Sequence, residues 1–124
     1  MREPCFRGYK INKNITHFLP NTVLFSNENE SITVSMIKDA LDYILDIIAI
    51  QSPVTESYKT ARTVFGAMKM LLENRKPSKP SKTDMKTAID VLEEITNLSA
   101  KSEQEKEQNA RCACLCKMII NRYC

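Results

Sequence analysis

Hydrophobic residues recur at helical spacing through the middle of the chain, most densely between residues 31 and 51. One face carries Ile37, Ala40, Leu41, Ile44 and Ile48, and other apolar side chains fill much of the remaining circumference. Only a narrow polar seam is left, and it contains three aspartates. A helix with so small a polar face is usually packed on two or more sides. The pattern therefore predicts the central helix of a bundle and excludes a membrane span.

Three further amphipathic helices are predicted, at about 54–74, 83–99 and 102–123. Thr55 is the expected N-cap of the first, and Ser81 with Asp84 resembles a capping box for the second. Ser102 with Glu105 has the same signature. As an alternative, the last two segments form one long helix with a projecting polar stretch.

Residues 1–30 are rich in apolar side chains that follow no helical period. Tyr9 and Ile11 alternate with polar neighbours over a stretch that permits one short strand without a partner. The segment is expected to be an extended arm that seals the bundle. The alternative is that it docks on another subunit or partner, by strand addition or insertion into a groove. The candidate docking residues are Phe6, Tyr9, Phe18, Leu19 and Phe25.

Together these elements predict an all-α fold, a four-helix (or three-plus-one) bundle with an extended, partly apolar N-terminal arm. The expected organisation is an arm at 1–30 and a helical bundle domain at 31–124. A basic linker, KPSKPSK, lies at 76–82 inside the bundle domain.

Composition narrows the chemistry that this fold can carry. The 124 residues suffice for one domain with a core of its own, and the net charge of +3 is mild. Two glycines, Gly8 and Gly66, cannot make a dinucleotide fingerprint or a Walker A loop. The first residues lack the apolar core of a signal peptide, so an intracellular chain with reduced thiols is expected.

The basic linker is the main candidate for contact with an anion. It continues a run of positive charge that begins on the predicted helix at 54–74. The candidate nucleic-acid or anion contacts are Lys59, Arg62, Lys69, Arg75, Lys76, Lys79 and Lys82. No aromatic residue is interleaved in the linker, so it offers no platform for base stacking. A plain solvated connector is the competing interpretation.

The cysteines form the one local pattern of chemical interest. Cys112 and Cys116 are four residues apart and share a helix face, whereas Cys114 points away. A structural zinc site needs four ligands, and Cys5, Cys124 or the single His17 would have to converge from distant positions. We therefore expect no metal, no cofactor and no catalytic residue, with Cys112 and Cys116 packed as small apolar side chains.

The resulting expectation is a non-enzymatic helical interaction module that binds a protein partner, self-associates, or does both. The alternative is a nucleic-acid-binding regulator that uses the basic residues of 59–82. A metal or redox switch built on the cysteines is the third hypothesis. Abundant Lys, Ile and Asn indicate an AT-rich coding sequence, which fits a small viral or microbial accessory protein.

Overall fold

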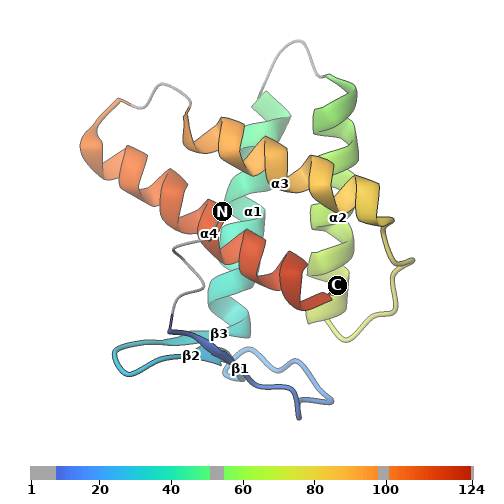
Figure 1. Cartoon of the computed structure of the whole chain (residues 1–124), viewed down its shortest axis with the longest axis vertical. Helices are drawn as coiled ribbons and strands as arrows, with labels where there is room; N and C mark the ends of the chain where they lie inside the picture. The colour runs from blue at the N-terminus through green and yellow to red at the C-terminus, as the bar shows by residue number, and fades with distance from the viewer. Residues whose placement is uncertain (1–7, 51–54, 98–100, 124) are drawn as a thin grey trace.

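The computed structural model describes residues 8–50, 55–97 and 101–123, which form a mostly helical fold with a small antiparallel sheet (Figure 1). The elements in chain order are β1 (Lys10–Ile11), β2 (Val23–Ser26), β3 (Ser31–Thr33), α1 (Val34–Ile50), α2 (Glu56–Leu72), α3 (Lys82–Thr96) and α4 (Glu103–Tyr123). The helices confirm the helical part of the prediction, and the sheet shows that the fold is not purely α.

The four helices pack around one shared hydrophobic core. α1 contacts α2 and α4, and α3 lies across α2 and α4 on the side away from α1 (Figure 1). The predicted stripe on α1 is buried, while Asp39 and Asp46 of its polar seam are exposed. Each helix therefore buries the face that its apolar spacing marks out.

The predicted helix starts at Thr55, Ser81 and Ser102 are confirmed by side-chain capping. The Thr55 hydroxyl accepts from the backbone N–H of Tyr58 at 3.2 Å, and the Ser81 hydroxyl accepts from that of Asp84 at 3.1 Å. The Ser102 hydroxyl accepts from the N–H of Glu105, also at 3.1 Å. Because α3 ends at Thr96 and α4 has its own cap, the alternative of one long helix is wrong.

The prediction of a lone strand in an extended arm is also wrong. β1, β2 and β3 pair in that order into an antiparallel sheet, with Ile11 opposite Phe25 and Phe25 opposite Ile32. The strands are only two to four residues long, too short to show a period. In β2 the adjacent Leu24 and Phe25 are both buried, so the alternation that usually marks a strand is missing.

The third strand takes the residues that were expected to begin the central helix. Ser31–Thr33 pair with β2, and α1 starts only at Val34, where the Thr33 hydroxyl accepts from the N–H of Met36. The sheet thus runs straight into α1. Leu24, Phe25 and Ile32 belong to the same buried cluster as the helix stripes, so the N-terminal segment closes one end of the core.

Candidate cationic face

The segment between β1 and β2 is fixed to the C-terminal end of α2 by one asparagine. Asn74 adopts a left-handed backbone conformation with φ of 62°, which asparagine tolerates better than most residues. Its Oδ1 accepts from the backbone N–H of Phe18 at 2.7 Å, and its Nδ2 donates to the Phe18 carbonyl at 3.4 Å. His17 and Phe18 are therefore held beside the start of the basic linker.

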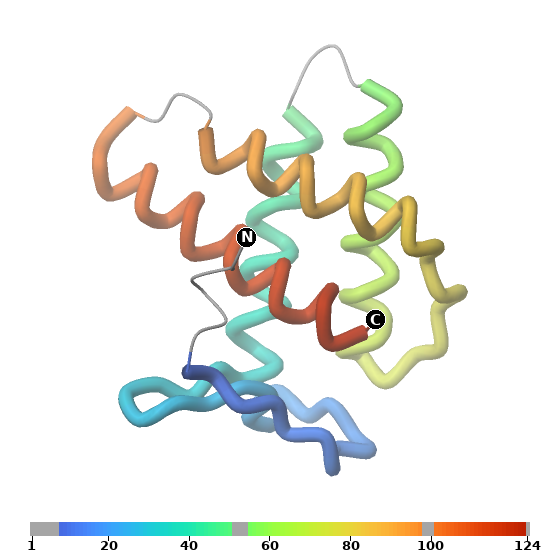
Figure 2. Tube along the Cα trace, viewed as in Figure 1, coloured from blue at the N-terminus to red at the C-terminus, as the bar shows by residue number. Residues whose placement is uncertain are grey.

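The C-terminal end of α4 reaches the same place. The Arg122 guanidinium lies over the Phe18 ring, 5.5 Å from its centroid, and donates to the Asn12 carbonyl at 3.3 Å. The ammonium of Lys79 lies 5.8 Å from the centroid of the Tyr123 ring. Three segments far apart in sequence thus meet at one end of the molecule, as the trace in Figure 2 shows.

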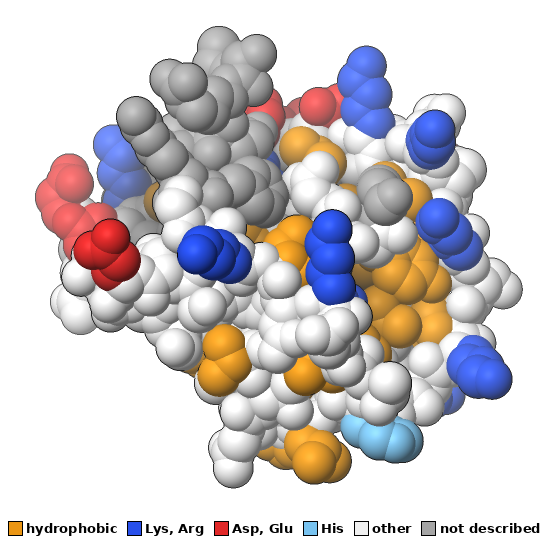
Figure 3. Space-filling view, turned by 60° about the horizontal axis from the view of Figure 1, so that its bottom comes forward, with side chains coloured by type: hydrophobic (Ala, Val, Ile, Leu, Met, Phe, Trp, Pro, Cys, Tyr) orange, Lys and Arg blue, Asp and Glu red, His pale blue; other side chains and the backbone are white. Residues whose placement is uncertain are grey.

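We call this surface the cationic face. It comprises Lys13, His17, Phe18, Arg75, Lys76, Lys79, Arg122 and Tyr123. In Figure 3, most of the Lys and Arg side chains visible lie at the centre and right of the end that carries the pale-blue His17, with hydrophobic surface between them. The acidic side chains visible in that view lie at its left and upper margins.

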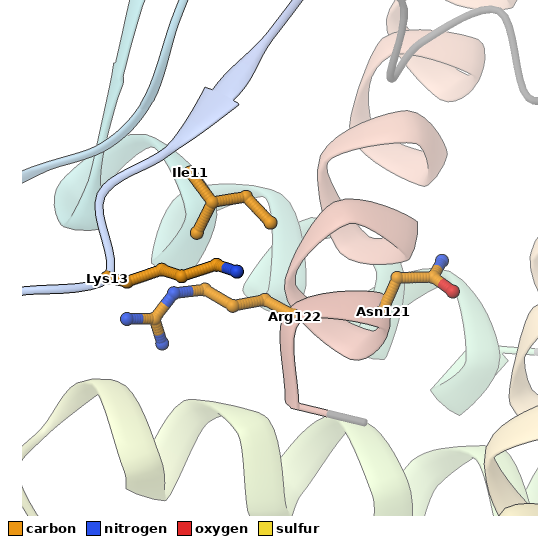
Figure 4. Close-up of a pocket in the computed structure, with 4 residues that line it drawn as sticks. All are labelled: Ile11, Lys13, Asn121 and Arg122. Atoms are coloured by element: carbon orange, nitrogen blue, oxygen red, sulfur yellow. The ribbon is translucent and has the colours of Figure 1, made fainter.

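Two recesses open on the cationic face. The first, of about 420 Å³, is lined by Ile11, Lys13, Asn121 and Arg122 (Figure 4). The second, of about 300 Å³, is lined by Thr16, His17, Phe18, Leu71, Asn74, Arg75 and Lys76. Phe18 lies between them, because its ring supports Arg122 of the first recess and lines the second.

The positive charge of the face is largely unopposed. Among the described residues, no carboxylate lies within ion-pair distance of Lys13, Lys76, Lys79 or Arg122. Arg75 lies 3.7 Å from Glu73, which also pairs with Lys38. Partial burial lowers the pKa of Arg122 from its usual value, but an arginine stays charged at neutral pH. The face is therefore suited to binding an anion.

The seven basic residues predicted from sequence are not brought together in one patch. Lys59 lies in the first turn of α2, about 20 Å along the helix axis from Leu72. It pairs with Glu56 at 3.9 Å, and Arg62 is exposed one turn further on. Lys82 is exposed at the start of α3. Only Arg75, Lys76 and Lys79 of the seven belong to the cationic face.

Lys69 forms an ion pair between two helices and lies outside the cationic face. Its ammonium lies 2.6 Å from the Asp42 carboxylate of α1, and this hydrogen bond raises the pKa of Lys69. The pair joins α1 to α2, so this lysine contributes to packing of the bundle.

Most of the described candidate docking residues are buried or make contacts within the chain. Phe25 is only 2% exposed, so its ring is not at the surface. The Tyr9 hydroxyl donates to the Glu30 carboxylate, which also pairs with Arg111 of α4. Phe18 supports Arg122, whereas Leu19 is 62% exposed. Phe6 lies outside the described residues.

Cys112 and Cys116 of α4 are free thiols that face or border the core. Cys116 is fully buried, and this burial raises its thiol pKa well above the usual value, while Cys112 is half-buried with a raised pKa for the same reason. Within the described ranges, no group of three or more His, Cys, Asp or Glu side chains is placed to hold a metal ion. No helix in those ranges is long and apolar enough to cross a membrane.

Sequence reasoning missed Lys13, Arg122 and the ring of Tyr123. Lys13 and Arg122 are 109 positions apart, and no local spacing marks either of them. Comparison with protein families, with characterised proteins and with solved structures finds no match for this chain. The geometry of the face is therefore the main guide to function.

Proposed function

We propose that this chain is a non-enzymatic helical module that binds single-stranded nucleic acid through the cationic face. The observation that carries the proposal is a cluster of cations from three segments around two aromatic rings, in which Arg75 alone has a described carboxylate within ion-pair distance. Proteins that bind single strands combine a positive surface that follows the phosphates with planar groups that contact bases. Here the planar groups are the guanidinium of Arg122, which Phe18 supports on one face, and the ring of Tyr123, which has Lys79 on one face.

The fold places aromatic rings beside the basic residues and uses apolar residues of the N-terminal arm for packing. The linker has no aromatic residue of its own, but the fold supplies Tyr123 beside Lys79 and Phe18 beside Arg122. Of the described apolar residues of the arm, Leu24 and Phe25 lie in the core, and Tyr9, Ile15 and Phe18 pack against it. Among the described residues, the most exposed large apolar side chains are those of Leu19 and Ile50. They lie near opposite ends of α1, so they do not form one apolar surface.

Fluorescence anisotropy with a short labelled single-stranded RNA, over a range of salt concentrations, tests the proposal. Contact with about three to five phosphates predicts a slope of roughly −2 to −3.5 in log affinity against log salt, at about −0.7 per phosphate. A duplex of the same sequence and an acidic peptide are the comparison ligands. Absence of binding to RNA at low salt would contradict the proposal, and binding of the peptide alone would indicate a protein partner.

A pair of matched double variants locates the contact. Lys76→Ala with Lys79→Ala removes two charges from the cationic face, and we expect the slope to fall by about 1 to 1.5. Lys59→Ala with Arg62→Ala removes the same charge from the other end of α2 and should leave the slope unchanged. Equal losses in both would mean that binding follows net charge and not this face. Light scattering on the reduced protein, with and without RNA, tests self-association at the same time.

A further inference from the structure

The recess between β1 and the end of α4 contains a pair of cations in an unusual arrangement. In Figure 4 the side chains of Lys13 and Arg122 lie alongside each other and run in opposite directions, with Ile11 above them and Asn121 turned away. Their charged groups therefore lie at opposite ends of this antiparallel pair, and neither has a carboxylate of the described residues within ion-pair distance, so both attract an anion that enters the recess.

Arg122 is also held in a fixed orientation. Its guanidinium lies over the Phe18 ring and donates to the Asn12 carbonyl, so its plane is set before any ligand arrives. Its Nε–H is buried and meets no hydrogen-bond acceptor among the described residues. A buried donor without an acceptor is costly, and such groups in native proteins need an explanation. Because this Nε–H is buried, an anion oxygen becomes its acceptor only when the side chains that cover it move aside.

We infer that this recess binds a phosphate monoester, such as the terminal phosphate of a nucleic-acid strand. Two positive charges match the charge of about −1.5 to −2 that a monoester carries at neutral pH, better than the single charge of a backbone phosphodiester. The fork of a guanidinium fits two phosphate oxygens at once, while a lysine side chain is long enough to turn aside and pair with the same group. That the phosphate belongs to a nucleic-acid strand rests on the proposed function. The phosphate site itself does not depend on it.

Two strands that differ only at the 5′ end test the site. We expect a 5′-phosphorylated single-stranded RNA to bind about tenfold more tightly than the same strand with a 5′-hydroxyl, the size expected for a charge-assisted contact. The preference should disappear in Arg122→Lys, which keeps the charge but loses the fork, and should fall in Lys13→Ala. Arg62→Lys, the same substitution at an exposed position on α2, is the control and should keep the preference. Thermal melts show that each variant is folded.

A second measurement separates failure of the site from failure of the proposed function. The Nε–H resonance of Arg122, assigned through Arg122→Lys, should shift on titration with inorganic phosphate and with a nucleoside monophosphate. A shift without any binding of RNA would overturn the proposed function and keep the phosphate site. RNA binding that ignores the 5′ phosphate, together with an unmoved resonance, would overturn the site and keep the proposed function. Equal loss of the preference in Arg122→Lys and Arg62→Lys would also overturn it.

Discussion

Replacement of Leu24 by alanine separates the two roles considered for the N-terminal segment. Leu24 is 0% exposed in β2 and belongs to the core cluster that the helices share. Leu19, five positions earlier, is 62% exposed. If the segment closes the core of its own chain, Leu24→Ala should strongly lower the free energy of unfolding and Leu19→Ala should leave it nearly unchanged. If the segment docks on a second copy, both should act mainly on the oligomeric state.

The expected size follows from burial. Truncation of a fully buried leucine costs about 2 to 5 kcal/mol through lost transfer free energy and the cavity left behind. A chain of this length has roughly 6 to 19 kcal/mol of total stability, at about 0.05 to 0.15 kcal/mol per residue. A loss near the middle of the range, about 3 kcal/mol, should lower Tm by roughly 10 to 15 °C. Leu19→Ala should stay within about 0.5 kcal/mol of the parent protein.

Urea denaturation followed by circular dichroism measures both free energies of unfolding, and light scattering on the same samples reports mass. Leu24→Ala should move the denaturation midpoint to lower urea without a change in the mass of the folded protein. The reasoning would be refuted if Leu24→Ala kept the parent midpoint. It would also be refuted if Leu19→Ala were equally destabilising, or if either substitution turned an oligomer into a stable monomer.

Three further predictions concern the helices. Gly66→Ala should stabilise the protein by about 0.5 to 1 kcal/mol in urea denaturation, because alanine is the better helix former and its Cβ meets no atom within 4 Å beyond its chain neighbours and the backbone of its own helix. A loss of stability would contradict this. Tyr43→Phe removes the hydroxyl that donates to Oδ1 of the buried Asn109. It should lower the free energy of unfolding by about 1 to 3 kcal/mol, because the Asn109 amide is left without this partner. The double variant Tyr43→Phe, Asn109→Leu should recover part of that loss. Burial raises the pKa of the Cys116 thiol in the folded protein. Above about pH 8.5 the thiol of the unfolded chain therefore loses its proton while the folded one keeps it. The free energy of unfolding falls as pH rises through this range. The drop in urea midpoint between about pH 7 and about pH 9.5 should therefore be smaller in Cys116→Ala, and an equal drop would count against this assignment.

The helices were predictable because each repeats its apolar period over 15 to 21 residues and most begin at a recognisable cap. The caps at Thr55, Ser81 and Ser102 act through a side-chain oxygen and a backbone N–H three residues on, a purely local interaction. Information of this kind is fully present in a short window of sequence.

The sheet and the cationic face depend on contacts that no short window contains. Lys10–Ile11 is a strand only because β2 lies beside it, and a register shift between Val23 and Phe25 interrupts the alternation of β2, so that Leu24 and Phe25 both reach the same buried cluster. The Arg122–Phe18 and Asn74–Phe18 contacts join positions 104 and 56 residues apart. Sequence identified the charge of the linker, but the aromatic rings and the two further cations come from tertiary structure.

Because the cationic face is built from three segments that are distant in sequence, binding of a ligand to it is coupled to folding. Residues 13–18, 74–79 and 121–123 adjoin only when the sheet, the end of α2 and the end of α4 are all in place. A ligand that contacts all three segments at once therefore binds the folded chain much more tightly than the unfolded chain. By mass action, such a ligand at a hundred times its Kd adds about 2.7 kcal/mol to the free energy of unfolding. The melting temperature of the whole chain thus reports whether the face is occupied, whichever anion fills it.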